Sequence, residues 1–163
     1  MSPRSNRNMH CSVARTLDVL GDKWSLLVIR DAFYGLKRFE EFQRDLGIAR
    51  NVLTDRLERL VAEGILEREQ YEDRPPRFEY VLTRKGKALF PVMMTIEHWG
   101  DTWLVPTGDE VPVTWTHTTC GTEDIHAATT CSACGEELRP RHMRPEPVTI
   151  QGARLNEDLL ATG

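Results

Sequence analysis

Residues 45–66 read DLGIARNVLTDRLERLVAEGIL, the pattern of a helix with two unlike faces. Leu53, Leu57 and Leu60 recur at helical spacing, so they predict one face that packs on a core. The first two turns carry polar residues away from that face, namely Arg50, Asn51, Thr54, Arg56 and Arg59. This pattern raises the question of which anionic partner the polar face meets.

The overall charge of the chain, taken alone, argues against a nucleic-acid partner. The 163 residues have a formal net charge of −4. Residues 105–163, however, contain four arginines and nine carboxylates, whereas residues 1–59 contain 11 basic and eight acidic side chains. Because the local field acts on a nearby phosphate, the acidic C-terminal part does not exclude DNA binding at the front of the chain.

The composition is that of a soluble protein with a core, at 40% hydrophobic and 28% charged residues. No apolar run approaches the roughly 20 residues that a membrane span requires, so no membrane partner is expected. The opening MSPRSNRNMHC lacks the apolar segment of a secretion signal. Four cysteines do not make a dense disulfide pattern, and we therefore expect a cytoplasmic, reducing location.

Further elements are predicted on both sides of residues 45–66. Apolar stripes that end at Gly21, Gly35 and Gly47 predict three earlier helices, over about 12–20, 23–34 and 38–46. The period then changes to two, so residues 65–71 and 77–83 are predicted to be strands, joined by the turn sequence EDRPPR. A long amphipathic helix is expected over residues 84–104, with a kink at Pro91.

Two helices joined by a tight glycine turn and followed by a basic hairpin predict a winged helix-turn-helix. In such a unit the second helix enters the major groove of DNA, and the hairpin lies near the minor groove or the backbone. Arginine matches guanine or phosphate, Asn matches adenine, and Thr donates to phosphate. The predicted DNA contacts are Arg38, Arg50, Asn51, Thr54, Arg56, Arg59, Arg74 and Arg77. Asp55 and Glu58 argue for the alternative, an ordinary solvated helix face of mixed charge.

Several motifs resemble those of the HxlR-type winged-helix regulators, which are relatives of the MarR group. The motifs are GDKWSLLVIRD at 21–31, KRFEEF at 37–42, LTDRLERLVAEGIL at 53–66 and PPRFEYVLTRKG at 75–86, preceded by a cysteine at position 11. The resemblance covers most of residues 10–104. It implies a homodimeric, sequence-specific DNA-binding transcriptional regulator, usually a repressor, paired through its terminal helices.

The resemblance also makes Cys11 a candidate redox sensor, because some such regulators sense electrophiles or oxidants through a cysteine at this place. A helix N-terminus and a nearby arginine, here Arg15, both favour a thiolate in general. An inert, half-buried cysteine with no resolving partner nearby in sequence is the other interpretation. The sequence does not identify an effector, either a small molecule or an oxidant, nor an operator.

The remaining three cysteines lie in HTTCGTEDIHAATTCSACG, residues 117–135. Two residues separate His117 from Cys120, and two separate Cys131 from Cys134. Cys120 and Cys134 each precede a glycine, as in a zinc knuckle, where a tight turn supplies two ligands. Two knuckles predict one structural zinc per chain, held by a tetrahedral Cys3His set.

Other interpretations of this segment stay open. His126 or His142 could take the place of His117 as the nitrogen ligand, and a metal-free hairpin is an alternative to zinc. Cys131 and Cys134 could instead form the CxxC pair of a thiol–disulfide oxidoreductase, but the chain lacks the βαβ pattern that carries such a motif. No other catalytic signature is present, so no enzymatic activity is expected. A winged helix that binds proteins would also explain Asp55 and the modest basic charge.

The predicted fold class is α+β, a winged helix-turn-helix with long terminal dimerisation helices and a small C-terminal β-rich appendage. We expect a mobile N-terminal arm over residues 1–9 and a DNA-binding and dimerisation domain over residues 10–104. A zinc-ribbon-like appendage is expected over residues 105–150, and a mobile tail over residues 151–163.

Overall fold

The computed structural model describes residues 11–123 and 125–143, so the predicted arm at 1–9 and tail at 151–163 lie outside the described residues. The chain divides into two compact units, residues 1–90 and 91–163. The first contains the helix-turn-helix and the hairpin, and the second contains most of the last long helix and the cysteine-rich segment. Among the described helices, none combines the length and the apolar character needed to cross a membrane.

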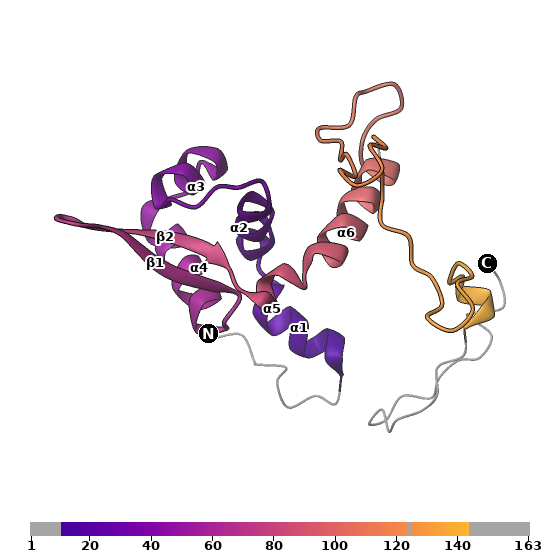
Figure 1. The fold of residues 1–163 in the computed structure, drawn as a ribbon, viewed down its shortest axis with the longest axis horizontal. Helices are drawn as coiled ribbons and strands as arrows, with labels where there is room; N and C mark the ends of the chain where they lie inside the picture. The colour runs from indigo at the N-terminus through magenta and orange to yellow at the C-terminus, as the bar shows by residue number, and fades with distance from the viewer. Residues whose placement is uncertain (1–10, 124, 144–163) are drawn as a thin grey trace. The chain divides into compact units, whose positions relative to one another are not determined.

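Four helices precede the hairpin in the first unit (Figure 1): α1 (Ser12–Leu20), α2 (Lys23–Phe33), α3 (Phe39–Leu46) and α4 (Arg50–Ala62). Asp22 begins α2, because its carboxylate accepts hydrogen bonds from the backbone N–H groups of Trp24 and Ser25. Gly47 ends α3 in the left-handed region at φ 61°, where a side chain would be strained. All four helices lie where the sequence predicts them.

The core of this unit confirms the predicted apolar face of α4. Leu53, Leu57 and Leu60 have no exposed surface, and they are joined by Phe42 from α3 and Ile29 from α2. Burying an aliphatic or aromatic side chain of this size contributes about 1.5–3 kcal/mol each. The face of α4 opposite to these leucines is left to solvent.

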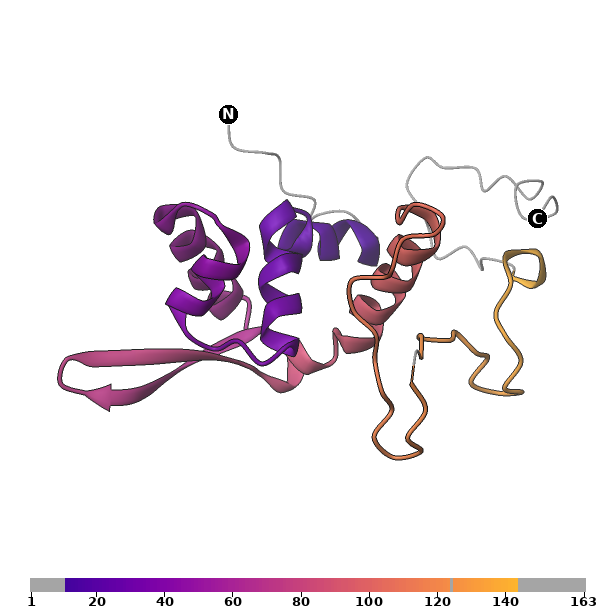
Figure 2. The ribbon, with the colours of Figure 1, turned by 90° about the horizontal axis from the view of Figure 1, so that it is seen from above.

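The hairpin consists of β1 (Leu66–Asp73) and β2 (Pro76–Leu82), which pair antiparallel from Leu66 with Leu82 to Asp73 with Pro76. Figures 1 and 2 show it extending past the helices as a long two-stranded wing. The backbone N–H of Tyr80 donates to the carbonyl of Lys37 over 2.8 Å, which ties β2 to the loop before α3. The predicted wing is therefore present and anchored at its base.

The predicted continuous helix over 84–104 is wrong, because the structure has two helices, α5 (Arg84–Lys87) and α6 (Phe90–Trp103). Residues 88 and 89 form a turn between them. Pro91 has no N–H to donate to the carbonyl four residues earlier, and its ring crowds that carbonyl, so a helix is readily interrupted just before it. The expected kink at Pro91 is thus a break.

The predicted β-rich appendage has less strand than expected. Its described part, residues 105–123 and 125–143, has two isolated bridges, His117 with Thr122 and Thr130 with Glu137, and a short 3-10 turn η1 (Pro140–His142). Its first part runs along α6 (Figure 1), where the indole N–H of Trp115 donates to Glu97 over 2.8 Å. With few large apolar residues to bury, this segment forms tight turns rather than a sheet.

Candidate nucleic-acid interface

The front of α4 begins directly after the turn between α3 and α4. Gly47 ends α3, and Ala49 in extended conformation redirects the chain into α4. Arg50 and Asn51 therefore stand in the first turn of α4 with exposed side chains. Because the first N–H groups of a helix have no partner within it, this end also favours anionic ligands.

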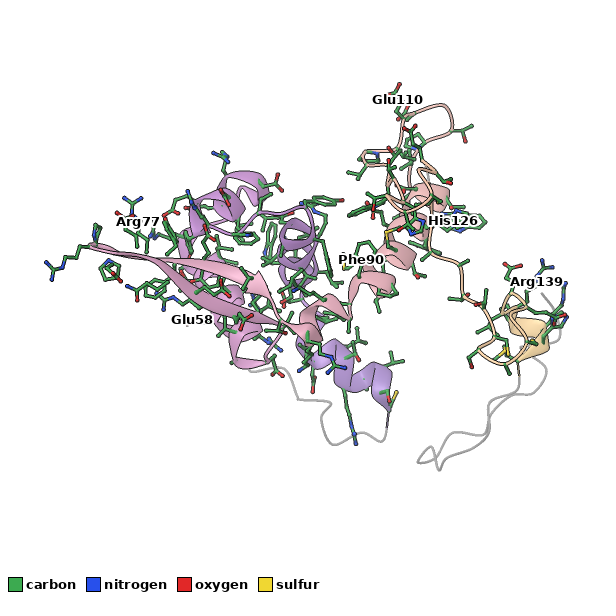
Figure 3. All side chains as sticks on the ribbon, viewed as in Figure 1. Glu58, Arg77, Phe90, Glu110, His126 and Arg139 are labelled. Carbon is green, nitrogen blue, oxygen red and sulfur yellow. The ribbon has the colours of Figure 1, made fainter. Side chains whose placement is uncertain are left out.

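A groove of about 960 Å³ lies between α3, α4 and the wing. Five arginines and three glutamates line it, together with aromatic side chains. Figure 3 shows Arg77 toward the outer end of the wing and Glu58 by α4. The charged lining residues are Arg38, Arg44, Arg50, Arg68, Arg77, Glu40, Glu41 and Glu58. The excess of arginine makes this concave face suitable for a phosphate backbone.

Two predicted contacts on α4 have local partners that limit what they can do. The guanidinium carbon of Arg50 lies 4.7 Å from the ring centroid of Phe39, which holds the side chain at the mouth of the groove. Thr54 donates its hydroxyl hydrogen to the carbonyl of Arg50 over 2.9 Å. In this rotamer the hydroxyl of Thr54 can accept a hydrogen bond but has no proton left for a phosphate.

Arg56 and Arg59 lie on the flank of α4 rather than on its front. Arg56 is 22% exposed and pairs with Asp22 and Asp55, each over 3.1 Å. Arg59 donates to the backbone carbonyl of Asp18. Successive residues of a helix are rotated by about 100°, so Arg56 and Arg59 lie on one side of the buried leucine stripe and Arg50 lies on the other. The sequence separates these two sides of α4, but it does not show which of them faces the groove.

The pairing of Arg56 with Asp22 is also electrostatically significant. Partial burial works to raise the pKa of Asp22, but hydrogen bonds from Ser25 and Trp24 and the charge of Arg56 outweigh it, so this pKa is lowered. Asp22 therefore remains ionised at the N-terminus of α2. Arg56 thus links α4 to the capping residue of α2.

Arg38, which precedes α3, and Arg77 on the wing are both held by side chains of the hairpin. Arg38 pairs with Glu79 over 3.1 Å and lies 4.7 Å from the ring of Tyr71. Arg77 pairs with Glu72 over 3.2 Å. Arg74 is exposed in the turn between the strands. These exposed pairs are weak, so a phosphate can compete for the arginines.

Two arginines of the groove were missed in the sequence. Arg44 lies on α3, and Arg68 on β1 approaches the ring of Phe78 to 3.5 Å. The sequence could have indicated Arg68, because side chains alternate along a strand and Arg68 therefore lies on the same face of β1 as Leu66. Arg44 gave no comparable signal, since its exposure depends on how α3 packs.

The cysteine-rich segment brings each predicted pair of ligands together, but not all four. Nδ1 of His117 lies 3.1 Å from Sγ of Cys120. A second turn joins Cys131 and Cys134, where the N–H of Gly135 donates to the carbonyl of Cys131 over 2.8 Å. Within residues 11–123 and 125–143, no group of three or more His, Cys, Asp or Glu side chains is close enough to hold a metal.

Hydrogen bonds in the two turns act on the thiols. The hydroxyl and backbone of Thr122 lower the pKa of Cys120. The backbone N–H groups of Cys134 and Ala133 lower the pKa of Cys131. Hydrogen bonds of this kind favour the thiolate, which is the form that binds metals.

Cys11 is the N-cap of α1, and its Sγ accepts the backbone N–H of Ala14 over 3.5 Å. The side chain is exposed, so the expectation of a half-buried cysteine is wrong. No further cysteine follows it before residue 120. The structure leaves both a reactive and an inert Cys11 open.

One face of α6 carries four exposed apolar side chains. Val92, Ile96, Trp99 and Trp103 follow one another at spacings of four, three and four residues, and the two tryptophans are 56% and 71% exposed. This is the spacing of a seam between paired helices. On α1, apolar side chains are exposed as well.

Three comparisons relate this chain to known proteins. The sequence profile of the HxlR-like helix-turn-helix family matches residues 19–107. An uncharacterized HTH-type transcriptional regulator of Mycobacterium tuberculosis is 40% identical over 147 residues, covering 90% of this chain and 92% of that protein. The crystal structure of PA1607, described as a candidate transcription factor, matches with a TM-score of 0.79 at 37% identity, covering 88% of this chain and 99% of that one.

The likeness to a further solved structure covers little more than half of the chain. The redox regulator HypR in its reduced form matches with a TM-score of 0.54 at 40% identity. This match covers 56% of the present chain and 92% of HypR. Each of the matched proteins named here is described as a regulator or a transcription factor.

Proposed function

The chain belongs to the HxlR-like helix-turn-helix family of transcriptional regulators, and we propose that it is a homodimeric repressor of a specific operator in double-stranded DNA. The observation that carries this proposal is the exposed front of α4 beside a groove rich in arginine. A repressor of this kind acts by occupying its site. The matched proteins give no support to the alternative of a thiol–disulfide oxidoreductase.

The contacts are proposed to divide between bases and backbone. Arg50 and Asn51 meet base edges, because they stand in the exposed first turn of α4 and offer the donors that match guanine and adenine. Arg38 and Arg77 bind phosphates from the wing side of the groove, and Arg74 reaches the backbone or minor groove from the tip. Asp55 and Glu58 repel phosphates and so restrict how α4 can lie.

Arg56 and Arg59 receive a different role in this proposal. Their guanidinium groups already engage Asp22 and the carbonyl of Asp18, so we assign them to holding α4 in place. Their removal would then affect DNA binding only through the position of α4. Thr54 is assigned to the backbone as an acceptor, since its proton is used within the helix.

The partner of the exposed stripe on α6 is proposed to be a second copy of the chain. A single recognition helix touches few base pairs, so specific binding requires two helices about one turn of DNA apart. The seam spacing of Val92, Ile96, Trp99 and Trp103 fits helix pairing between protomers. Ile96→Glu should give a monomer by light scattering, whereas Thr95→Glu, exposed outside the stripe, should remain a dimer.

The DNA proposal is tested by selecting an operator from a random pool and measuring its affinity for two variants. Arg50→Ala should weaken binding by about 1–3 kcal/mol, because a contact to a base or phosphate is lost. Arg139→Ala removes the same charge from an exposed position in the other unit and should bind as the wild type does. Equal affinity of the Arg50 variant and the wild type would remove the front of α4 from the interface.

A redox effector is a second proposal, favoured by the exposed position of Cys11 at the N-terminus of α1. The similarity to a protein described as a redox regulator supports it. A thiol-oxidising agent should change operator affinity in the wild type and in Cys131→Ser, but not in Cys11→Ser. If oxidation changed the operator affinity of Cys11→Ser as much as that of the wild type, a group other than Cys11 would be the sensor.

A further inference from the structure

The two turns of the cysteine-rich segment have the same backbone pattern. In the first, the N–H of His117 donates to the carbonyl of Thr122 over 2.8 Å, and the N–H of Gly121 donates to the carbonyl of His117 over 2.8 Å. In the second, the N–H of Cys131 donates to the carbonyl of Glu136 over 2.7 Å, and the N–H of Gly135 donates to the carbonyl of Cys131 over 2.8 Å. The offsets of five and four residues are identical in both turns.

Glycine occupies the same place in both turns. Gly121 has a φ of 72° and Gly135 a φ of 77°, a conformation that other residues rarely adopt. Each glycine follows the second ligand of its pair, which is a cysteine in both, so the chain can fold around the thiol. The two hairpins therefore have the same turn structure, with the same hydrogen bonds and a glycine at the same position.

The side chains of the first turn already have the spacing of metal ligands. Nδ1 of His117 and Sγ of Cys120 are 3.1 Å apart. Tetrahedral zinc with ordinary Zn–N and Zn–S bonds would hold these atoms about 3.6 Å apart. A shift of a few tenths of an ångström therefore suffices to admit the ion. His126 is less available as a ligand, because its ring stacks on His98 at a centroid distance of 4.2 Å.

The connection between the turns is symmetric. Ten residues separate Cys120 from Cys131, and the hairpins continue toward its middle through bonds from Ile125 to Trp115 and from Leu138 to Thr129. If the first five residues of the connection run away from the first turn and the next five run antiparallel to them, the second turn lies beside the first. The described structure holds the two pairs apart, and a reversal at the middle of this connection would bring them together.

Packing gives little to hold these hairpins. Of the described residues in 105–143, none is buried, and Cys120 and Cys134 are exposed. A segment this short needs a disulfide, a metal or a partner surface to keep a fixed structure. From the paired turns and their ligand spacing, we propose that His117, Cys120, Cys131 and Cys134 of each chain bind one structural zinc ion. A closed set of four ligands leaves no position for catalysis.

The test is to purify the full chain without added metal and to measure its zinc content by elemental mass spectrometry. Wild type should hold about one zinc per chain. Cys131→Ser and Cys120→Ser should lose it, whereas Cys11→Ser, which removes the exposed cysteine outside the turns, should keep it. Zinc below roughly a tenth of an ion per chain, with hairpin amides still protected from exchange in chelator, would overturn the proposal.

Cobalt substitution identifies the ligands independently of zinc content. Co²⁺ added in excess to the wild type should show thiolate charge-transfer absorption and tetrahedral d–d bands. In each Cys→Ser variant of the set, the same excess loads the weakened site, and the charge-transfer absorption should fall by about a third because one of three thiolates is missing. His117→Asn should shift the d–d bands, and His126→Asn should not. A spectrum that responds to His126 and not to His117 would overturn the ligand set.

Discussion

The first unit and the cysteine-rich segment of the second are held together in different ways. In the first, Leu53, Leu57 and Leu60 pack with residues of α2 and α3 into a core with no exposed surface. In the second, the described residues beyond 104 form tight turns and backbone bonds, and none of them is buried. Burial fixes the position of α4, whereas local turns fix the two pairs of proposed zinc ligands.

This difference has consequences for what each region can tolerate. A packed core responds to the loss of even one methylene group, because surrounding atoms cannot fill the space. A segment organised by turns responds to changes at glycines and ligands, and little to changes at its scattered apolar residues. The two regions should therefore differ most in their response to the same type of substitution.

The largest expected effect is that of Leu57→Ala. This side chain is fully buried on α4, so its truncation should lower the free energy of unfolding of the first unit by about 2–5 kcal/mol. Leu138→Ala is the matched change in the turn-rich segment, where the side chain is 38% exposed, and it should cost well under half as much. Chemical denaturation followed by circular dichroism measures both; equal losses would show that the regions are not held differently.

A smaller effect is expected from a buried carboxyl in α2. Burial raises the pKa of Asp31 to about 6, although Arg30 opposes this by pairing with it over 2.6 Å, and Asp45 adds to the rise. The folded chain therefore keeps a proton that the unfolded chain releases between about pH 4 and pH 6. The protonated carboxyl therefore favours the folded chain at low pH, and this contribution is lost as the pH rises through 6. The free energy of unfolding falls by up to about 3 kcal/mol over this range.

Asp31→Asn should remove that pH dependence, because the amide cannot release a proton. The unfolding free energy is measured at pH 5 and pH 7, and the change between them is compared with that of the wild type. Asp109→Asn, at an exposed position, serves as the control. Carboxyls with lowered pKa, such as Asp22, have the opposite pH dependence but are common to all three proteins. The same pH dependence in Asp31→Asn and the wild type would contradict the assignment.

Arg56→Ala tests which arginines of α4 belong to the scaffold. Its loss should destabilise the first unit by about 1–2 kcal/mol, since the partly buried carboxylate of Asp22 loses a charged partner. Arg50→Ala should leave stability nearly unchanged, because Arg50 is exposed. Thermal melts of both variants provide the measurement, and a stable Arg56 variant with weakened operator binding would return Arg56 to the interface.

The sequence alone was sufficient for α1 to α4 and for the two strands of the wing. The leucine spacing in 53–60, the glycine after α3 and the alternation in the wing are local signals, and each has its expected structure. The packing of α5 was less accessible. Gly86 within α5 is buried so close to the carbonyl oxygen of Ile65 that a Cβ would not fit, and only the packed structure reveals this approach.

The candidate site was only partly accessible to sequence reasoning for a related reason. Arg50 and Arg56 look alike in the sequence of α4, yet one stands on an aromatic ring at the groove and the other pairs with Asp22, 34 positions earlier. Contacts between such distant positions follow from how the helices pack. The proposed zinc ligands differ in this respect, because spacing and glycines within 117–135 define each pair locally.

The salt dependence of operator binding tests the central claim, that the groove between α4 and the wing binds the DNA backbone. The logarithm of affinity should fall linearly with the logarithm of salt concentration in the wild type. Arg77→Ala should make this slope shallower by about one for each phosphate contact that is lost, and Arg139→Ala should leave it unchanged. A slope that is the same in the wild type and in Arg77→Ala would contradict the account and place the DNA on another surface.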